Sequence, residues 1–147
     1  MDINTVLNEI LVKLFRNIST IEENALKKGK FKNITVNDMH VMEAIGTGEP
    51  KNMTAVAKEL AVTTGTLTIS VNSLVKKGLV ERVRSEEDRR VVLVSLSESG
   101  KAAYEHHQKF HKKMVDAVVE SLTEEEKDVL AKALSNLSEY FQKNLKQ

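Results

Sequence analysis

Residues 60–100 decide the fold, and they read LAVTTGTLTISVNSLVKKGLVERVRSEEDRRVVLVSLSESG. The first half of this stretch predicts a helix from about Gly65 to Lys77, because its apolar residues recur every three or four positions. Gly78 follows at the place where a left-handed residue often closes a helix. The apolar stripe consists of Leu67, Val71 and Leu74.

The second half of the stretch changes from helical periodicity to alternation. Alternation in Leu79, Glu81 and Val83, and again in Val92, Val94 and Leu96, predicts two strands around the polar turn SEEDRR. A short helix is predicted just upstream, in MTAVAKEL at residues 53–60. Two short helices followed directly by a basic hairpin are the parts of a winged helix-turn-helix.

The outward side of the predicted 65–77 helix carries small hydrogen-bonding residues, whereas an ordinary solvated helix face would be richer in Glu, Lys and Gln. Small polar side chains can approach base edges closely, and an asparagine can read adenine through two hydrogen bonds. We therefore expect this face, which we call the outward arc, to contact DNA. Its candidate residues are Thr64, Gly65, Thr66, Thr68, Ile69, Asn72, Ser73 and Lys76.

Arginine is concentrated in the predicted hairpin. Four of the five arginines lie between positions 82 and 90, although the formal net charge of the chain is only +1. A wing after a recognition helix lies over the neighbouring minor groove, where arginine is favoured by the negative potential. Asp88 can brace Arg90 through a charge-assisted hydrogen bond. The candidate wing contacts are Arg82, Arg84, Asp88, Arg89 and Arg90.

Long amphipathic helices are predicted at both ends of the chain. Including these, the expected fold is mainly α with a small β-wing: six helices and a β-hairpin in one domain of residues 1–147. The winged core is expected at about 35–97, and the flanking helices at about 2–28 and 98–147. The first and last helices have apolar faces that a small three-helix core does not need. They are expected to pair with each other or with a partner.

Composition excludes several classes of function. The chain has no cysteine, so disulfides, thiolate metal sites and thiol-based redox sensing are excluded. We find no nucleophile motif and no phosphate-binding loop, and we expect neither enzymatic activity nor a cofactor. The N-terminus has an acid where a signal peptide needs basic residues, and no run of about 18 apolar residues exists. The expected location is the cytoplasm, without membrane association.

The 60–100 stretch resembles the DNA-binding core of MarR-family transcriptional regulators, including the D-x-R wing at Asp88 and Arg90 and the LS-x-x-G sequence that ends at Gly100. The strings VTTGTLT, ERVRSEEDRRVV and FKNITVNDMH are most similar to the fatty-acid-synthesis repressors of that family. The resemblance implies an interleaved homodimer in which the terminal helices intertwine. Such a dimer presents two recognition helices to a palindromic operator in double-stranded DNA.

The same resemblance implies that an acylated acyl carrier protein acts as corepressor. An acyl chain needs a long apolar slot, and methionines suit one because they repack easily. A basic cluster at Lys27, Lys28, Lys30 and Lys32 suits an acidic carrier. The candidate slot residues are Ile18, Ile21, Phe31, Met39, Met42, Phe110 and Met114.

Two histidines suggest zinc as an alternative effector. His107 and His111 are four residues apart and so share one helical face, where two imidazoles can chelate zinc. A site needs further ligands from elsewhere, for instance His40 or Glu22. The sequence itself predicts ordinary histidines without metal, and a zinc-responsive regulator of the same fold is the alternative.

Overall fold

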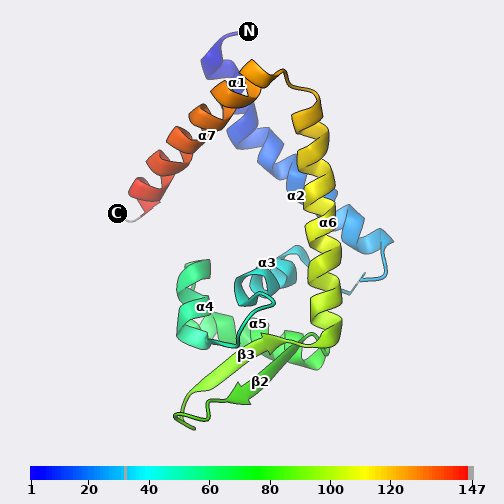
Figure 1. The fold of residues 1–147 in the computed structure, drawn as a ribbon, viewed down its shortest axis with the longest axis vertical. Coiled ribbons are helices and arrows are strands. Elements are labelled where there is room, and N and C mark those ends of the chain that lie inside the picture. Colours follow the sequence, from blue (N-terminus) through cyan, green and yellow to red (C-terminus); the bar gives the residue numbers. More distant parts are fainter. Residues whose placement is uncertain (32, 146–147) are drawn as a thin grey trace. The chain divides into compact units, whose positions relative to one another are not determined.

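Helices make up most of the chain, and a small antiparallel sheet joins them (Figure 1). The computed structural model describes residues 1–31 and 33–145. These fall into two compact units, the first ending at His107 and the second beginning at Gln108. Lys32, one member of the expected basic cluster, lies outside the described residues. No helix in the described part of the chain is long and apolar enough to cross a membrane.

The first unit contains the winged helix-turn-helix that the sequence predicts. Within the winged core, the three helices α3, α4 and α5 precede the hairpin, and the strand order of the sheet is β1-β3-β2 with both pairings antiparallel. The elements are α1 (Ile3–Glu9), η1 (Ile10–Leu14), α2 (Phe15–Lys28), α3 (Val36–Ile45), β1 (Lys51–Asn52), α4 (Met53–Leu60), α5 (Thr64–Lys76), β2 (Val80–Arg84) and β3 (Val92–Leu96). The α6 helix (Glu98–Glu120) begins in this unit and continues into the second.

The N-terminal helical stretch agrees with the predicted segment of about 2–28. It runs without a break from Ile3 to Lys28, although η1 is a single π-helical segment between α1 and α2. Its C-terminal part buries Leu26 in the core and places Glu22 in a buried position. Because Glu22 is charged and lies on the buried face of α2, the apolar periodicity does not continue to Leu26.

Side-chain hydrogen bonds cap the starts of α3, α4 and α5. At the start of α3, the Asp38 amide donates to Thr35 Oγ1 at 3.0 Å and the Thr35 amide donates to Asp38 Oδ2 at 3.1 Å, which completes the capping box. Asn52 caps α4 by accepting from the Ala55 amide at 2.7 Å. Thr63 caps α5 by accepting from the Thr66 amide at 3.1 Å.

Two glycines shape the junction between α5, the hairpin and α6. Gly78 has a φ of 75°, the left-handed conformation predicted for the residue that closes the recognition helix. A Cβ at Gly100 would lie 2.0 Å from the Leu79 carbonyl oxygen, so only glycine lets α6 pass this close to the start of the wing. Ser97 links these two glycines, because its hydroxyl donates to the Gly78 carbonyl at 2.6 Å and accepts from the Gly100 amide at 3.1 Å.

The two-residue strand β1 was not anticipated. Lys51 and Asn52 pair with Val94 and Leu93 of β3, so the predicted hairpin becomes the larger part of a three-stranded sheet. The segment is too short for alternation to be detected, and it follows the only proline of the chain.

The core of the first unit lies between α3, α4, α5 and the sheet. The predicted stripe of α5 is buried as expected, and it meets the two methionines of α3. The side chains with less than 2% exposure are Met39, Met42, Ile45, Val56, Leu67, Val71, Leu74 and Val94.

The second unit holds the end of α6 and the helix α7 (Glu124–Leu145). A capping box opens α7, because the Thr123 amide donates to Glu126 Oε2 at 2.8 Å and the Glu126 amide donates to Thr123 Oγ1 at 3.2 Å. Large apolar residues of this unit remain exposed, namely Val115, Val118, Val119, Val129, Leu130, Leu134, Tyr140 and Phe141.

Candidate nucleic-acid interface

The outward arc of α5 is exposed as the helical periodicity predicts. Leu67, Val71 and Leu74 are buried, while the candidate contacts on the opposite side are exposed except Ser73, which is half-buried. Ile69 is 73% exposed, which is unusual for a large apolar side chain. The arc is therefore a solvent-facing surface of small polar groups around one apolar residue.

Threonine hydroxyls on this face are partly engaged with their own helix. Thr68 Oγ1 donates to the Thr64 carbonyl at 2.8 Å, and Thr63 Oγ1 donates to Thr66 Oγ1 at 3.0 Å. These bonds orient the side chains and still leave hydroxyl lone pairs to accept from outside.

The tip of the wing is organised around Asp88. Its carboxylate accepts from Arg90 three times, from Nε, Nη2 and the backbone amide, each at 3.1 Å. The side-chain bonds from Arg90, followed by the backbone bond, hold the pKa of the Asp88 carboxyl below its usual range. The Arg90 side chain is 91% exposed, so the brace fixes a guanidinium that solvent surrounds. The predicted Asp88–Arg90 pair is confirmed.

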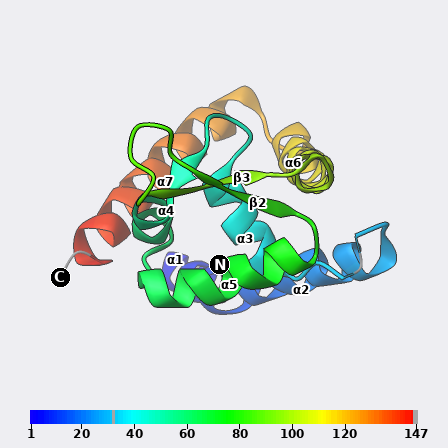
Figure 2. The same ribbon diagram turned by 90° about the horizontal axis from the view of Figure 1, so that it is seen from below.

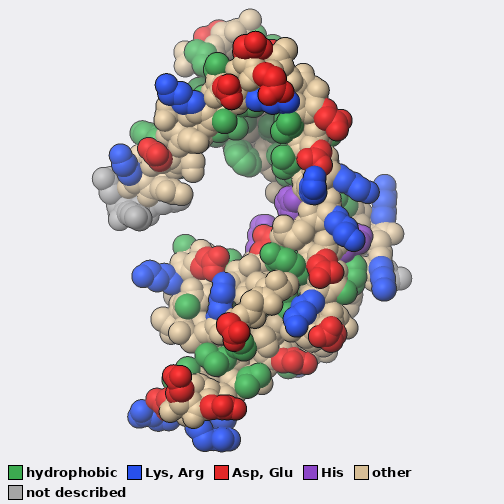
Figure 3. Space-filling model, in the orientation of Figure 1, with side chains coloured by type: hydrophobic (Ala, Val, Ile, Leu, Met, Phe, Trp, Pro, Cys, Tyr) green, Lys and Arg blue, Asp and Glu red, His purple; other side chains and the backbone are tan. Residues whose placement is uncertain are grey.

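Arginines of β2 have different partners from each other. Arg84 Nη1 donates to the Arg89 carbonyl at 2.8 Å, which ties the strand to the wing tip. Arg82 Nη2 donates to Asn72 Oδ1 and so connects the strand to the outward arc of α5. Arg82, Arg84, Arg89 and Arg90 are all exposed. Figure 3 shows basic and acidic side chains gathered over the wing, at the lower end of the view.

Recognition helix and wing are held in register by the chain itself. The α5 helix leads directly into β2 through residues 77–79 (Figure 2). Lys77, at the end of α5, donates to Asp38 Oδ2 at 2.7 Å and to the Asn33 carbonyl at 2.9 Å. The outward arc and the wing are thus presented by one packed unit, as a DNA-reading surface requires.

The predicted slot residues of the first unit have unequal exposure. Met39 and Met42 have no exposed surface and belong to the core, and Phe31 packs against that core half-buried. Ile18 is half-buried and Ile21 is 52% exposed on α2. In the second unit, Phe110 and Met114 are half-buried on α6.

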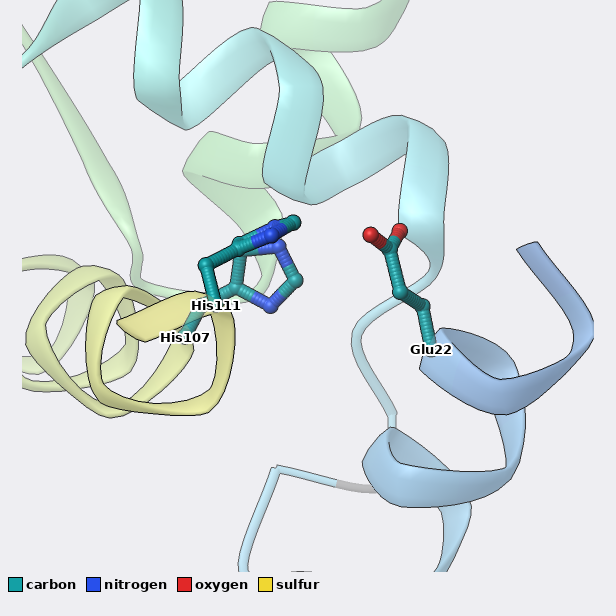
Figure 4. A group of neighbouring side chains, drawn as sticks. All are labelled: Glu22, His107 and His111. Carbon is teal, nitrogen blue, oxygen red and sulfur yellow. The ribbon is translucent and has the colours of Figure 1, made fainter. Parts of the chain in front are cut away.

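A buried polar cluster links α2, α3 and α6 within the first unit. His107 is 2% exposed, and its Nε2 lies 3.2 Å from Glu43 Oε1. The Glu22 carboxylate is directed toward His107, and ligand atoms of the two residues lie within 4.8 Å of each other (Figure 4). His111 follows one turn later on α6. His40 is exposed and lines a groove of about 190 Å³ with Asn37, Thr66 and Ser70.

Glu43 is the member of this cluster that the sequence reasoning missed. It lies in the apolar segment VMEAI of α3, and a lone carboxylate in such a segment is a signal for a buried polar partner.

Known proteins share this architecture. Residues 25–107 match the family described as transcriptional regulator SarA/Rot. The chain is 30% identical to the HTH-type transcriptional repressor YetL of Bacillus subtilis, over 94% of this chain and 75% of that one.

Two solved structures extend the likeness to nearly the whole chain. FabT of Streptococcus pneumoniae in complex with DNA has a TM-score of 0.90 and 41% identity, covering 95% of this chain and 98% of the other. Apo MarR of E. coli has a TM-score of 0.67 and 25% identity, covering 93% and 97%. The chain therefore belongs to the SarA/Rot family of transcriptional regulators and has the winged-helix architecture of the MarR type.

Proposed function

We propose that the protein is a dimeric repressor that binds a palindromic operator of fatty-acid-synthesis genes, with an acylated acyl carrier protein as corepressor. The observation that carries the DNA-binding part is the combination of the exposed outward arc with a wing whose arginine is braced by Asp88. The likeness to FabT, which was solved on DNA, supports the assignment over nearly the whole chain.

In this proposal the outward arc enters the major groove and the wing follows the neighbouring minor groove. Thr64, Gly65, Thr66, Thr68, Ile69, Asn72, Ser73 and Lys76 belong to the arc. Arg89 and Arg90 belong to the wing tip. Ile69 offers an apolar side chain of the kind that contacts a thymine methyl group.

Dimerisation is supported by the apolar surfaces of the terminal helices. In the first unit Ile3, Leu11 and Phe15 are exposed, and in the second unit Leu130 and Leu134 are exposed. Large apolar side chains that are exposed repeatedly along a helix mark an interaction surface. A second copy of the chain would cover them, with about 2–28 and 98–147 as dimerisation segments and about 35–97 as the reading core.

The corepressor part rests on α2, α3 and α6. The buried methionines of α3 can repack around an inserted chain, and Phe31 lies at the edge of the same core. Lys27, Lys28 and Lys30 are exposed, and Lys30 Nζ lies 6.0 Å from the centre of the Phe31 ring. An acidic carrier would find basic side chains next to an apolar entrance.

The direct test measures binding to promoter fragments of fatty-acid-synthesis genes by fluorescence anisotropy, with carrier protein bearing acyl chains of increasing length. Affinity for the operator should rise with chain length, since each buried methylene contributes up to about 0.8 kcal/mol. Met114→Trp should abolish this response and leave basal DNA binding intact. Met114→Leu, a swap of similar volume, is the matched control. A response that does not depend on acyl length would contradict the corepressor part.

A zinc-responsive regulator is the second candidate, and the cluster of Glu22 with His107 favours it. His111, one turn along the same helix, would supply another imidazole. DNA binding should then respond to zinc in the wild type and not in His111→Ala, whereas His106→Ala, a neighbouring exposed histidine, should behave like the wild type. Zinc independence in all three would leave His107 and Glu43 as a structural pair.

A further inference from the structure

Asn72 of α5 and Arg82 of β2 are joined across two elements by a hydrogen bond. Arg82 Nη2 donates to Asn72 Oδ1, and both side chains are exposed. Arg82 pairs through its backbone with Val94, whose side chain is fully buried, so the strand position that carries the arginine is fixed by the core. The bond therefore joins a wing residue to the helix that presents the outward arc.

The hydrogen bond changes what Asn72 can offer to a base. A bidentate contact to adenine uses Oδ1 to accept from the N6 amino group and Nδ2 to donate to N7. Here one of the two Oδ1 lone pairs already accepts from a cation, while the Nδ2 amino group and the remaining guanidinium N–H groups face outward as donors. The pair therefore presents mainly donors to DNA. Guanine offers two acceptors in the major groove, O6 and N7, whereas adenine offers one acceptor and one donor.

We infer that Asn72 and Arg82 act as one reading pair that selects guanine at one position of each half-site, with Arg82 working beside the recognition helix and not in the minor groove. This inference rests on the proposed DNA-binding function and goes beyond it by naming the base. Among the described residues, no carboxylate lies within ion-pairing distance of Arg82, so its charge is available to the guanine acceptors.

Arg84 provides the internal comparison. It lies two residues further along β2, on the same face of the strand, and it is also exposed. Its guanidinium donates to the Arg89 carbonyl and, among the described residues, makes no hydrogen bond to α5. Removing Arg84 takes away an equal charge from the same strand and leaves the Asn72–Arg82 bond in place.

The experiment uses the full-length protein and a half-site obtained by selection from random duplex DNA. Binding is measured for all four base pairs at every half-site position, for the wild type, Arg82→Ala, Asn72→Ala, the double variant, Arg82→Lys and Arg84→Ala. The wild type should prefer guanine at one position by roughly 5-fold to 150-fold, the discrimination of a good base contact. Arg82→Ala should remove this preference and allow adenine at the same position, because the guanidinium donors are lost and Asn72 Oδ1 no longer accepts from a cation.

The other variants separate a reading pair from two independent residues. The double variant should discriminate between base pairs as well as Asn72→Ala alone does. In a coupled pair the second substitution removes nothing further, so the two effects are not additive. Arg82→Lys should retain affinity for random DNA and lose the guanine preference, since lysine lacks the guanidinium fork. Arg84→Ala should leave base preference at that position unchanged.

An equal loss of affinity for all sequences in Arg82→Ala would make Arg82 a phosphate contact and overturn the inference. Additive effects of the two single substitutions would overturn it as well. If the selection yields no preferred sequence at all, the proposed function fails and this inference fails with it. A preferred sequence without Arg82-dependent discrimination contradicts only the reading pair.

Discussion

Replacing Arg90 with alanine tests the wing. The side chain is 91% exposed and its ion pair with Asp88 is at the surface, so the free energy of unfolding should change by no more than about 0.5 kcal/mol. Loss of a groove-inserted arginine costs about 1–3 kcal/mol of binding free energy per half-site. The proposed dimer, with two wings, should therefore lose about 2–6 kcal/mol, an affinity decrease from about 30-fold to about 20,000-fold.

The assay compares operator binding of Arg90→Ala and wild type by fluorescence anisotropy at several salt concentrations, with thermal unfolding recorded in parallel. Lys101→Ala is the matched control, because Lys101 is paired with Glu98 at 3.7 Å on α6 and also belongs to the first unit. Arg90→Ala should weaken binding and flatten the salt dependence, because each lost phosphate neutralisation lowers the slope by about 1. Unchanged operator affinity in Arg90→Ala, with a native melting curve, would refute the role of the wing.

Three further predictions follow from named contacts. The Asp88 carboxyl should titrate by NMR below the usual aspartate range, and its pKa should return toward that range in Arg90→Ala. Because this pKa is lowered in the folded state, the Asp88–Arg90 pair is present at neutral pH and is lost only as the pH falls through the lowered value. An identical titration in both proteins would contradict the pairing. Gly100→Ala should lower the melting temperature and destabilise the fold by about 1–3 kcal/mol or more, because its Cβ would lie 2.0 Å from the Leu79 carbonyl oxygen. Gly48→Ala is the control, because a Cβ at Gly48 meets no atom within 4 Å. Equal melting temperatures for the two variants would refute the close approach. Leu134→Glu, a change on the exposed apolar face of α7, should convert the proposed dimer to monomers in sedimentation experiments while Lys132→Glu does not. A dimeric Leu134→Glu would place the interface elsewhere.

The sequence was sufficient for the winged core because several local signals agreed there. The stripe of Leu67, Val71 and Leu74, the Thr63 cap and the left-handed Gly78 all indicate the same helix, and alternation resumes directly after it. The capping box of Thr35 with Asp38 is a local signal of the same kind, because it depends on two side chains three residues apart.

Contacts between distant segments were less accessible from the sequence. The pairing of Lys51 with Val94 involves two residues without alternation, and the meeting of Glu43 with His107 joins α3 to α6 across 64 positions. The Arg82–Asn72 bond altered an expectation about chemistry: asparagine alone predicts an adenine contact, and its neighbour on β2 already donates to the oxygen that such a contact uses. Tertiary proximity decided each of these features.

In vitro selection from random duplex DNA measures the central claim most directly. If the outward arc and the wing read DNA as a two-fold dimer, the enriched sequences should form a pseudo-palindrome with half-sites about 10–10.5 base pairs apart, centre to centre, or a multiple of that spacing. The affinity for the selected site should exceed that for random DNA by at least about 10³-fold at physiological salt. A lack of enrichment, or enriched sites without two-fold symmetry, would contradict a dimeric sequence-specific regulator.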